Sequence, residues 1–459
     1  MSTAKQGGST AVAATAEEYL TRFEAQTPGS KALYEEAQRY TPGGIHHNQR
    51  YTTPYPVYMT RAKGSRVWDV DGNEYIDMWM GHGDAILGHA PPRVVSRVQE
   101  VAAGGLHIGH TIDQEVTLAR DICEAIPSAE QVRFCVTGTE ATMYAVRMAR
   151  AFTGRNVILK LTGGWHGANT DLMVDVNPPE FIGPESRGLL PELTRYTRTV
   201  EINDIEGTAK AIAEAGDDFA GMILAPVLGG GNLISADTAY LNFLREETRK
   251  AGAILIFDEI VTGFRLALGG AQESYGIRPD LTTFGKIIGG GTPLGVIAGR
   301  SDILELTSVR RTVPKAEKVL IGGGTYSCNP LSMAAGIATL EELKSREQEI
   351  YPTLERRAAR LVEGVQQAFD AAGIPLRAGH AGSMVGFNFL KEAGLPVRNM
   401  GEAVAHTIPA KMQELGNRLR ARGVFIYKGG TLSTEHSDQD IETMIEAFTA
   451  CANEMAEAG

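Results

Sequence analysis

The sequence predicts an α/β protein with a mostly parallel sheet in a large domain and a smaller α+β domain. Three observations support this fold class. The chain has 459 residues, which is too long for one simple core. Short apolar runs alternate with helical patterns through the middle of the chain. From about residue 331 the pattern changes to a long helical stretch, short strands and a last helix.

The expected strands and helices follow from local patterns. Buried strands are indicated by the apolar runs at 132–136, 157–161, 221–224 and 253–257. Helices are expected after the turn Thr137-Gly138-Thr139, over 240–250, within 331–373 and over 438–455.

These elements suggest four segments. We expect a disordered tail over 1–15, an N-terminal segment over 16–85 that joins the small domain, a large ligand-binding domain over 86–330, and the C-terminal small domain over 331–459.

Composition excludes several classes of function. The net charge of −11 provides no basic surface for nucleic acid. No apolar run of about 18 residues occurs, so we expect no membrane span. The four cysteines show neither metal-binding nor disulfide spacing, which favours a reduced, cytoplasmic location and no bound metal.

Ligands of such sheets bind beyond the carboxyl ends of the strands, so the loops there carry the functional candidates. Gly138 and Thr139 open a helix directly after a strand, where free N–H groups and the helix dipole attract an anion such as phosphate. A simple capped helix start is the alternative. Neither a P-loop nor a strand–GxGxxG–helix pattern is present, which weighs against a dinucleotide.

Asp258 ends the apolar run AILIF. A carboxylate there is costly unless it is paired, so it could cap a helix, bind a metal or hold a cationic ring nitrogen. Glu259 should point to the opposite face, which makes a metal pair less natural.

Trp165 lies in the loop after the run VILKL and offers a stacking surface for a flat ligand. Equally, its indole could fill a domain seam. The adjacent His166 is, by itself, more typical of a structural hydrogen-bonding residue.

Lys286 stands in the apolar, glycine-rich stretch DLTTFGKIIGGGTPLG at 280–295. A desolvated lysine becomes a nucleophilic amine that can form a Schiff base with an aldehyde. A lysine whose head reaches solvent is the simpler reading for this residue alone.

The four features together match the needs of pyridoxal 5′-phosphate (PLP). Its phosphate needs a helix N-terminus, its ring a stacking partner, its pyridinium nitrogen an anion and its aldehyde a lysine. The sequence therefore predicts PLP as the cofactor.

The segments TGTEAT, GGWHG, FDEIVTGFR, DLTTFGKIIGGGTPLG and GGGTYSCNP resemble the class III aminotransferases of the fold-type I PLP enzymes. The chain looks most similar to the subgroup of glutamate-1-semialdehyde aminomutase, D-phenylglycine aminotransferase and β-phenylalanine aminotransferase. The resemblance extends from about residue 34 to the end.

This resemblance implies a role for each matching position. Lys286 would form the Schiff base and move the proton, and Asp258 would hold the pyridinium nitrogen. Ile260 would pack on the ring face opposite Trp165, which stands where the family usually has tyrosine. Thr325 matches a threonine that reaches the phosphate from the other subunit, so a homodimer with shared active sites is implied.

Substrate recognition departs from the aminomutase pattern at three places. Arg50 is kept where the family binds the substrate carboxylate, but 46–49 read HHNQ. His82 and the pair at 46–47 are expected to shape the pocket. The segment 426–442 is shorter than in aminomutases, and Ala225 stands where a glutamate is usual.

The sequence thus predicts a PLP-dependent aminotransferase that moves an amino group from an amino acid donor to a 2-oxo acid by a ping-pong mechanism. The main alternative is intramolecular transfer, as in glutamate-1-semialdehyde aminomutase. A racemase, a cofactor-binding protein without catalysis and a nicotinamide dehydrogenase are disfavoured.

Overall fold

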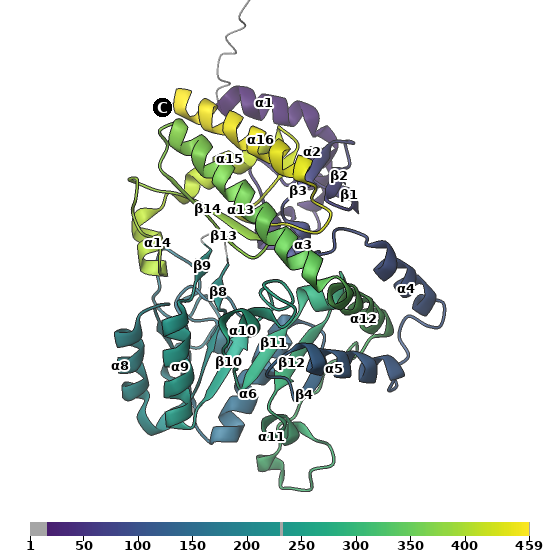
Figure 1. Cartoon of the computed structure of the whole chain (residues 1–459), viewed down its shortest axis with the longest axis vertical. Helices are drawn as coiled ribbons and strands as arrows, with labels where there is room; N and C mark the ends of the chain where they lie inside the picture. The colour runs from purple at the N-terminus through teal and green to yellow at the C-terminus, as the bar shows by residue number, and fades with distance from the viewer. Residues whose placement is uncertain (1–15, 230–232, 459) are drawn as a thin grey trace, which may run out of the picture.

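A computed structural model describes residues 16–229 and 233–458. Residues 1–15, expected to form a tail, lie outside this part. In Figure 1 the large sheet and the helices that cover it occupy the lower part of the view. A smaller assembly, built from the two ends of the chain, occupies the upper part.

The large sheet has the order β4-β12-β11-β10-β7-β5-β6. Its strands are β4 (Gln131–Cys135), β5 (Val157–Leu161), β6 (Thr197–Val200), β7 (Phe219–Leu224), β10 (Ile254–Asp258), β11 (Leu281–Phe284) and β12 (Gly295–Gly299). Only β12 runs against its neighbours, β11 and β4. The other adjacent pairs are parallel, as the alternation of strand and helix signals predicts.

Helices cover both faces of this sheet because its strands are apolar on both sides. Helix α6 (Gly138–Thr153) packs on one face through residues such as Ala141, Ala145 and Met148. Helices α8 (Ile205–Ala215) and α9 (Thr238–Ala251) pack on the other. Gly252 ends α9 in the left-handed conformation at φ 62°, where the sequence predicts the end of the helix.

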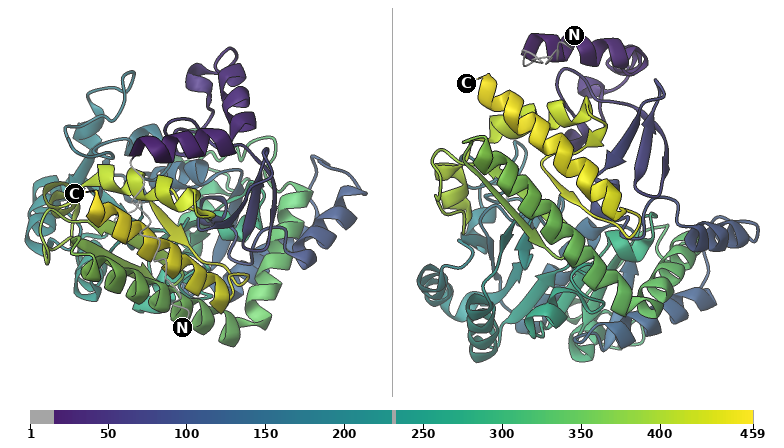
Figure 2. Two further views of the ribbon diagram at one scale, coloured as in Figure 1. Left: turned by 90° about the horizontal axis from the view of Figure 1, so that it is seen from above. Right: turned by 45° about the horizontal axis from the view of Figure 1, so that its top comes forward.

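The smaller assembly joins the two ends of the chain. Its four-stranded sheet has the order β1 (Met59–Lys63), β2 (Arg66–Asp69), β3 (Glu74–Asp77) and β15 (Val424–Phe425), and β15 lies parallel to β3. A second sheet has the order β13 (Leu376–Ala381), β14 (Met384–Phe389) and β16 (Gly429–Thr431). Figure 2 shows α1 (Ala16–Gln26) near the C-terminal α16 (Asp438–Glu457).

The helical stretch expected over 331–373 consists of two helices, α12 (Pro330–Ser345) and α13 (Glu347–Ala371). Arg346 separates them and binds Glu342 and Glu349, one on each side. Helix α12 packs against α4 (Pro92–Ala102), α5 (Asp113–Ala125) and the 3-10 turn Lys286–Gly289, whereas α13 packs against α16 and β13. The division of the chain into four segments stays a prediction.

The remaining α-helices and β-strands are between two and twelve residues long. They are α2 (Pro28–Ala37), α3 (Met80–Gly83), α7 (Leu193–Tyr196), β8 (Val227–Leu228), β9 (Ile234–Ser235), α10 (Gly270–Tyr275), α11 (Ser301–Leu304), α14 (Met400–His406) and α15 (Pro409–Arg420). In the described part of the chain, no helix is long and apolar enough to cross a membrane.

Candidate functional site

The candidate site is built from loops at one edge of the large sheet. Strands β4, β5, β10 and β11 point in the same direction, so their carboxyl ends meet at this edge. Asp258 is the last residue of β10, and Gly138, Trp165 and Lys286 lie just beyond the ends of β4, β5 and β11. The topology therefore gathers residues that are separated by up to about 150 positions.

Asp258 is buried at the end of β10 and is hydrogen-bonded through both carboxylate oxygens. Its Oδ1 accepts from the backbone of Ile260 at 3.2 Å and from Thr283 Oγ1 on β11 at 3.1 Å. Its Oδ2 lies 2.6 Å from Nδ1 of His166. These donors offset the cost of burying the charge and keep a carboxylate available at the sheet edge.

His166 is the functional candidate that sequence reasoning undervalued. It is buried, its Nδ1 contacts Asp258, and its backbone oxygen accepts from Thr142 of α6 at 2.7 Å. Its Nε2 is buried without a partner in the described residues. The only sequence signal was its place beside Trp165 in the loop after β5.

The start of α6 presents two free donors. The N-cap Thr137 accepts from Glu140 N, but the N–H groups of Gly138 and Thr139 have no recorded acceptor among the described residues. Such N–H groups at a helix start have no intrahelical partner and favour a phosphate. Thr139 Oγ1 also accepts from Ala168 N at 3.2 Å, which ties the Trp165 loop to this helix.

Ile260 lies between the helix start and the lysine loop. A Cβ atom on Gly138 would stand 2.8 Å from Ile260 Cδ1, and one on Gly285 would stand 3.2 Å from the same atom. Glycine at 138 is therefore needed for the close approach of Ile260. Trp165, the predicted stacking partner, is 54% exposed.

Lys286 opens the 3-10 turn after β11 with a left-handed backbone at φ 50°, which is strained for a lysine. Burial lowers the pKa of its amine, the charge of Arg265 lowers it further, and the carboxylates of Asp258 and Asp84 act in the opposite direction. A lowered pKa leaves more of the amine neutral and nucleophilic. Asp258 and Asp84 are far from Lys286 in the sequence, and the folded chain brings their carboxylates close enough to act on its amine.

Asp84 and Arg265 form a second charged layer that the sequence did not single out. Arg265 is fully buried, donates to Ser383 Oγ at 2.8 Å and to the Gly83 carbonyl, and leaves its Nε without a partner in the described structure. Burial raises the pKa of Asp84 to about 6. The arginine of the segment FDEIVTGFR was the only sequence signal for this layer.

Arg50 and His82 meet beside this site. Arg50 Nε donates to His82 Nε2 at 3.3 Å, and the His82 ring centre lies 4.6 Å from that of His47 and 4.5 Å from that of Trp79. The Trp79 ring contacts Tyr427 at 4.7 Å. Burial is the main cause that lowers the pKa of His47 and His82, and the charges of Arg50 and Lys286 lower both further. His46 instead contacts Thr41 at 3.4 Å.

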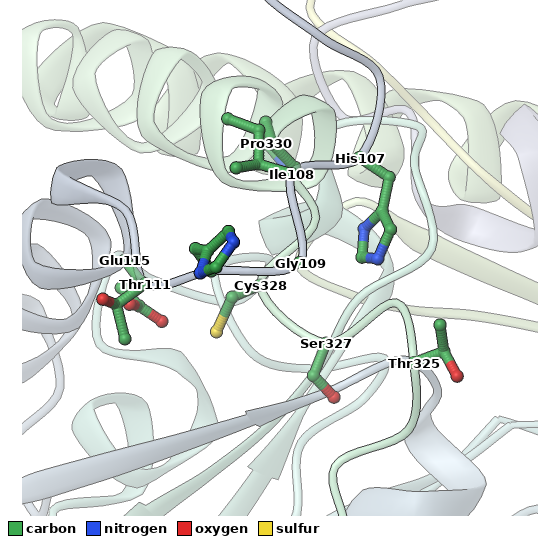
Figure 3. Close-up of a pocket in the computed structure, with 10 residues that line it drawn as sticks. His107, Ile108, Gly109, Thr111, Glu115, Thr325, Ser327, Cys328 and Pro330 are labelled. Carbon is green, nitrogen blue, oxygen red and sulfur yellow. The ribbon is translucent and has the colours of Figure 1, made fainter.

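Thr325 lies elsewhere in the single chain. It lines a pocket of about 240 Å³ with His107, Ser327, Cys328 and other residues, as Figure 3 shows. Among the described residues, no hydrogen bond or ion pair joins Thr325 to Lys286 or Asp258. The contact of Thr325 with the phosphate from a second copy of the chain stays a prediction.

Glu259 faces away from this edge, as expected from its position next to Asp258. Its carboxylate accepts from the backbone of Ala271 at 2.5 Å, from both nitrogens of Gln272 and from Thr262 Oγ1 at 3.1 Å. Burial raises its pKa to about 7. Asp258 and Glu259 therefore do not form a metal pair.

The residues at this edge fit PLP. The free N–H groups of Gly138 and Thr139 suit the phosphate, and the buried Asp258 suits a protonated ring nitrogen. Lys286, with its lowered amine pKa, suits the aldehyde. When bound, PLP would supply the electron sink for carbanion chemistry at the substrate Cα.

Comparisons with known proteins agree with this reading. Residues 47–450 match the sequence model of the family described as aminotransferase class III. Glutamate-1-semialdehyde 2,1-aminomutase from Methanobrevibacter smithii is 39% identical over 91% of this chain and 97% of its own. Glutamate-1-semialdehyde 2,1-aminomutase 2 from Brevibacillus brevis is 41% identical over 91% of this chain and 96% of its own.

Solved structures have the same fold. An omega-transaminase from Sphaerobacter thermophilus superposes with a TM-score of 0.85 at 32% identity and covers 94% of this chain and 99% of its own. A β-phenylalanine aminotransferase from Variovorax paradoxus superposes with a TM-score of 0.84 at 29% identity and covers 95% of this chain and 96% of its own.

Proposed function

The chain belongs to the class III aminotransferases, and on that premise we propose that it moves an amino group between an amino acid and a 2-oxo acid in two half-reactions. It is a PLP-dependent enzyme of fold type I. The observation that carries the proposal is the convergence of Lys286, Asp258 and the free start of α6 at one sheet edge, with Arg50 beside them.

The side chains divide the work by position and charge. Asp258, held by His166 and Thr283, would hold the ring nitrogen of the cofactor and stabilise a proton on it. Lys286 would remove the proton from the substrate Cα and return it to the cofactor carbon two atoms away, because its buried amine has a lowered pKa. Arg50 binds the substrate carboxylate through its guanidinium.

The aminomutase reaction is the second candidate. It is favoured by the sequence identity of 39% and 41% to two proteins named glutamate-1-semialdehyde 2,1-aminomutase. The short connection between β15 and β16 favours the aminotransferase. It contains only residues 426–428, and the side chain that it turns toward Trp79 is Tyr427 rather than a carboxylate.

The reaction can be settled by following the cofactor absorbance. The enzyme in its pyridoxamine form is mixed with pyruvate or 2-oxoglutarate, and we expect a 2-oxo acid to restore the PLP spectrum. Glutamate-1-semialdehyde is supplied in parallel. Its conversion to 5-aminolevulinate, without any reaction of the 2-oxo acids, would establish the aminomutase instead.

We also propose a homodimer in which Thr325 completes the partner's phosphate site. The loops around Thr325 expose Leu106, Ile108 and Tyr326, which a second chain would cover. Mixing Lys286→Ala chains with Thr325→Ala chains tests this. In a hybrid dimer with shared sites one active site is intact, so activity should exceed that of either variant. A cytoplasmic location remains part of the proposal.

A further inference from the structure

Among the described residues, the guanidinium of Arg50 hydrogen-bonds to one side chain, that of His82. Arg50 ends the 3-10 turn Asn48–Arg50, is exposed, and uses its Nε to donate to His82 Nε2 at 3.3 Å. In the described part of the chain neither terminal nitrogen of its guanidinium has a recorded partner. Those two nitrogens form the fork that binds a carboxylate in a bidentate manner.

The contact with Arg50 determines which nitrogen of the His82 imidazole carries the proton. Since Arg50 has no acceptor, Nε2 of His82 must accept, and the ring must carry its proton on Nδ1. Burial, His47, Arg50 and Lys286 all disfavour a second proton on this ring, and they lower the pKa of His82 to about 4. The hydrogen bond from Arg50 is therefore available throughout the neutral range.

The His82 ring is itself held in place. His82 has a left-handed backbone at φ 65°, between Gly81 at φ 63° and Gly83 at φ 79°. Its ring lies between those of Trp79 and His47, at 4.5 and 4.6 Å, so it cannot turn away from Arg50 without losing both contacts. Arg265 anchors the same turn through the Gly83 carbonyl.

We propose that His82 is a positioning residue that holds Arg50 through a neutral imidazole, so that the free guanidinium fork faces the carboxylate of the substrate. The proposal rests on the proposed function and refines its substrate class. Substrates with a carboxylate should depend on His82, whereas aldehydes or amines without one should not.

The test compares two acceptors that differ in the carboxylate. The pyridoxamine form reacts with pyruvate or with propanal, and the cofactor spectrum gives KM and kcat for each. We expect His82→Ala to raise KM for pyruvate about five- to tenfold, because the freed Arg50 side chain must be ordered on binding. Its kcat for pyruvate and both constants for propanal should change by less than about twofold.

A conservative variant distinguishes positioning from loss of structure. Glutamine places its amide oxygen about as far from the backbone as the imidazole Nε2, so it can accept from Arg50. His82→Gln should therefore keep the KM for pyruvate close to the wild-type value. His406→Ala, in α14, is the matched control, because that ring hydrogen-bonds to the Pro396 carbonyl and has no contact with Arg50 or His82 among the contacts of the described residues. It should leave both acceptors unaffected.

Propionate binding provides a readout that does not depend on the reaction. Calorimetric titration of the PLP-loaded enzyme should show weaker binding in His82→Ala and in Arg50→Ala, with recovery in His82→Gln. An NMR titration of the His82 ring should show no protonation between pH 8 and 5, as expected for a pKa of about 4.

The outcomes distinguish the positioning role of His82 from the proposed aminotransferase function. If Arg50→Ala weakens propionate and pyruvate but His82→Ala does not, the positioning role is wrong and the proposed function stands. Equal losses with pyruvate and propanal would also overturn it. If the wild-type enzyme transfers no amino group to either acceptor but propionate binding still follows His82, the proposed function fails and the positioning role survives.

Discussion

Replacing Asp84 by asparagine should stabilise the protein more at alkaline pH than at acidic pH. Asp84 follows the left-handed turn Met80–Gly83, and among the described residues no other residue donates a hydrogen bond to its carboxylate. Burial is the main cause that raises its pKa from 3.8 to about 6, while His89, Arg265 and Lys286 oppose the rise. The folded protein therefore favours the neutral acid, and asparagine is its closest uncharged replacement.

The sign and size follow from the linkage between protonation and folding. A carboxyl whose pKa is raised on folding is stabilising in its neutral form, and this contribution is lost as the pH rises from about 4 through about 6. A shift of about two pKa units corresponds to about 3 kcal/mol, which the wild type loses by pH 8. At pH 4 the loss is under about 1 kcal/mol. Because asparagine does not ionise, Asp84→Asn should not lose this free energy of unfolding as the pH rises.

Calorimetric unfolding of the cofactor-free protein at pH 5 and pH 8 measures the effect. We expect Tm of Asp84→Asn to exceed that of the wild type by a few degrees at pH 8 and by less at pH 5. Asp217→Asn, at an exposed position, is the control and should change Tm little at either pH. A gain that is equal at both pH values, or a loss at pH 8, would refute the reasoning.

Three further predictions concern the cofactor site. Lys286→Ala should abolish the visible absorbance of the covalently bound cofactor and the turnover; transamination at the wild-type rate would show that another group binds it. Asp258→Asn should keep the fold but lower kcat by several orders of magnitude, since several kcal/mol of transition-state stabilisation depend on the anion; steady-state kinetics with a normal kcat would contradict this. Gly138→Ala should weaken PLP binding about tenfold or more in a fluorescence titration, because the new Cβ would press on Ile260 Cδ1 from 2.8 Å; unchanged affinity would mean that the loop adapts.

The local patterns of the sequence were sufficient for the elements of the large domain. The runs at 157–161 and 253–257 form β5 and β10, and the helix expected over 240–250 forms α9 with its end at Gly252. Apolar runs, helical periodicity and glycine punctuation act between near neighbours, so they can be read without the fold. The stretch 331–373 was less clear, because the break at Arg346 depends on side-chain contacts with both flanking turns.

The motifs also determined the cofactor, since Lys286, Asp258 and the start of α6 each stand directly after a strand. The tertiary structure decided the contacts among them. His166 reaches Asp258 across 92 positions, and Arg50 reaches His82 across 32. The first pair depends on which strand ends lie side by side in the sheet. The second depends on how the left-handed turn at Met80–Gly83 orients the His82 ring. Asp84 shows the same point: its sequence neighbours are ordinary, and only the enclosing protein raises its pKa, because burial is a property of the fold.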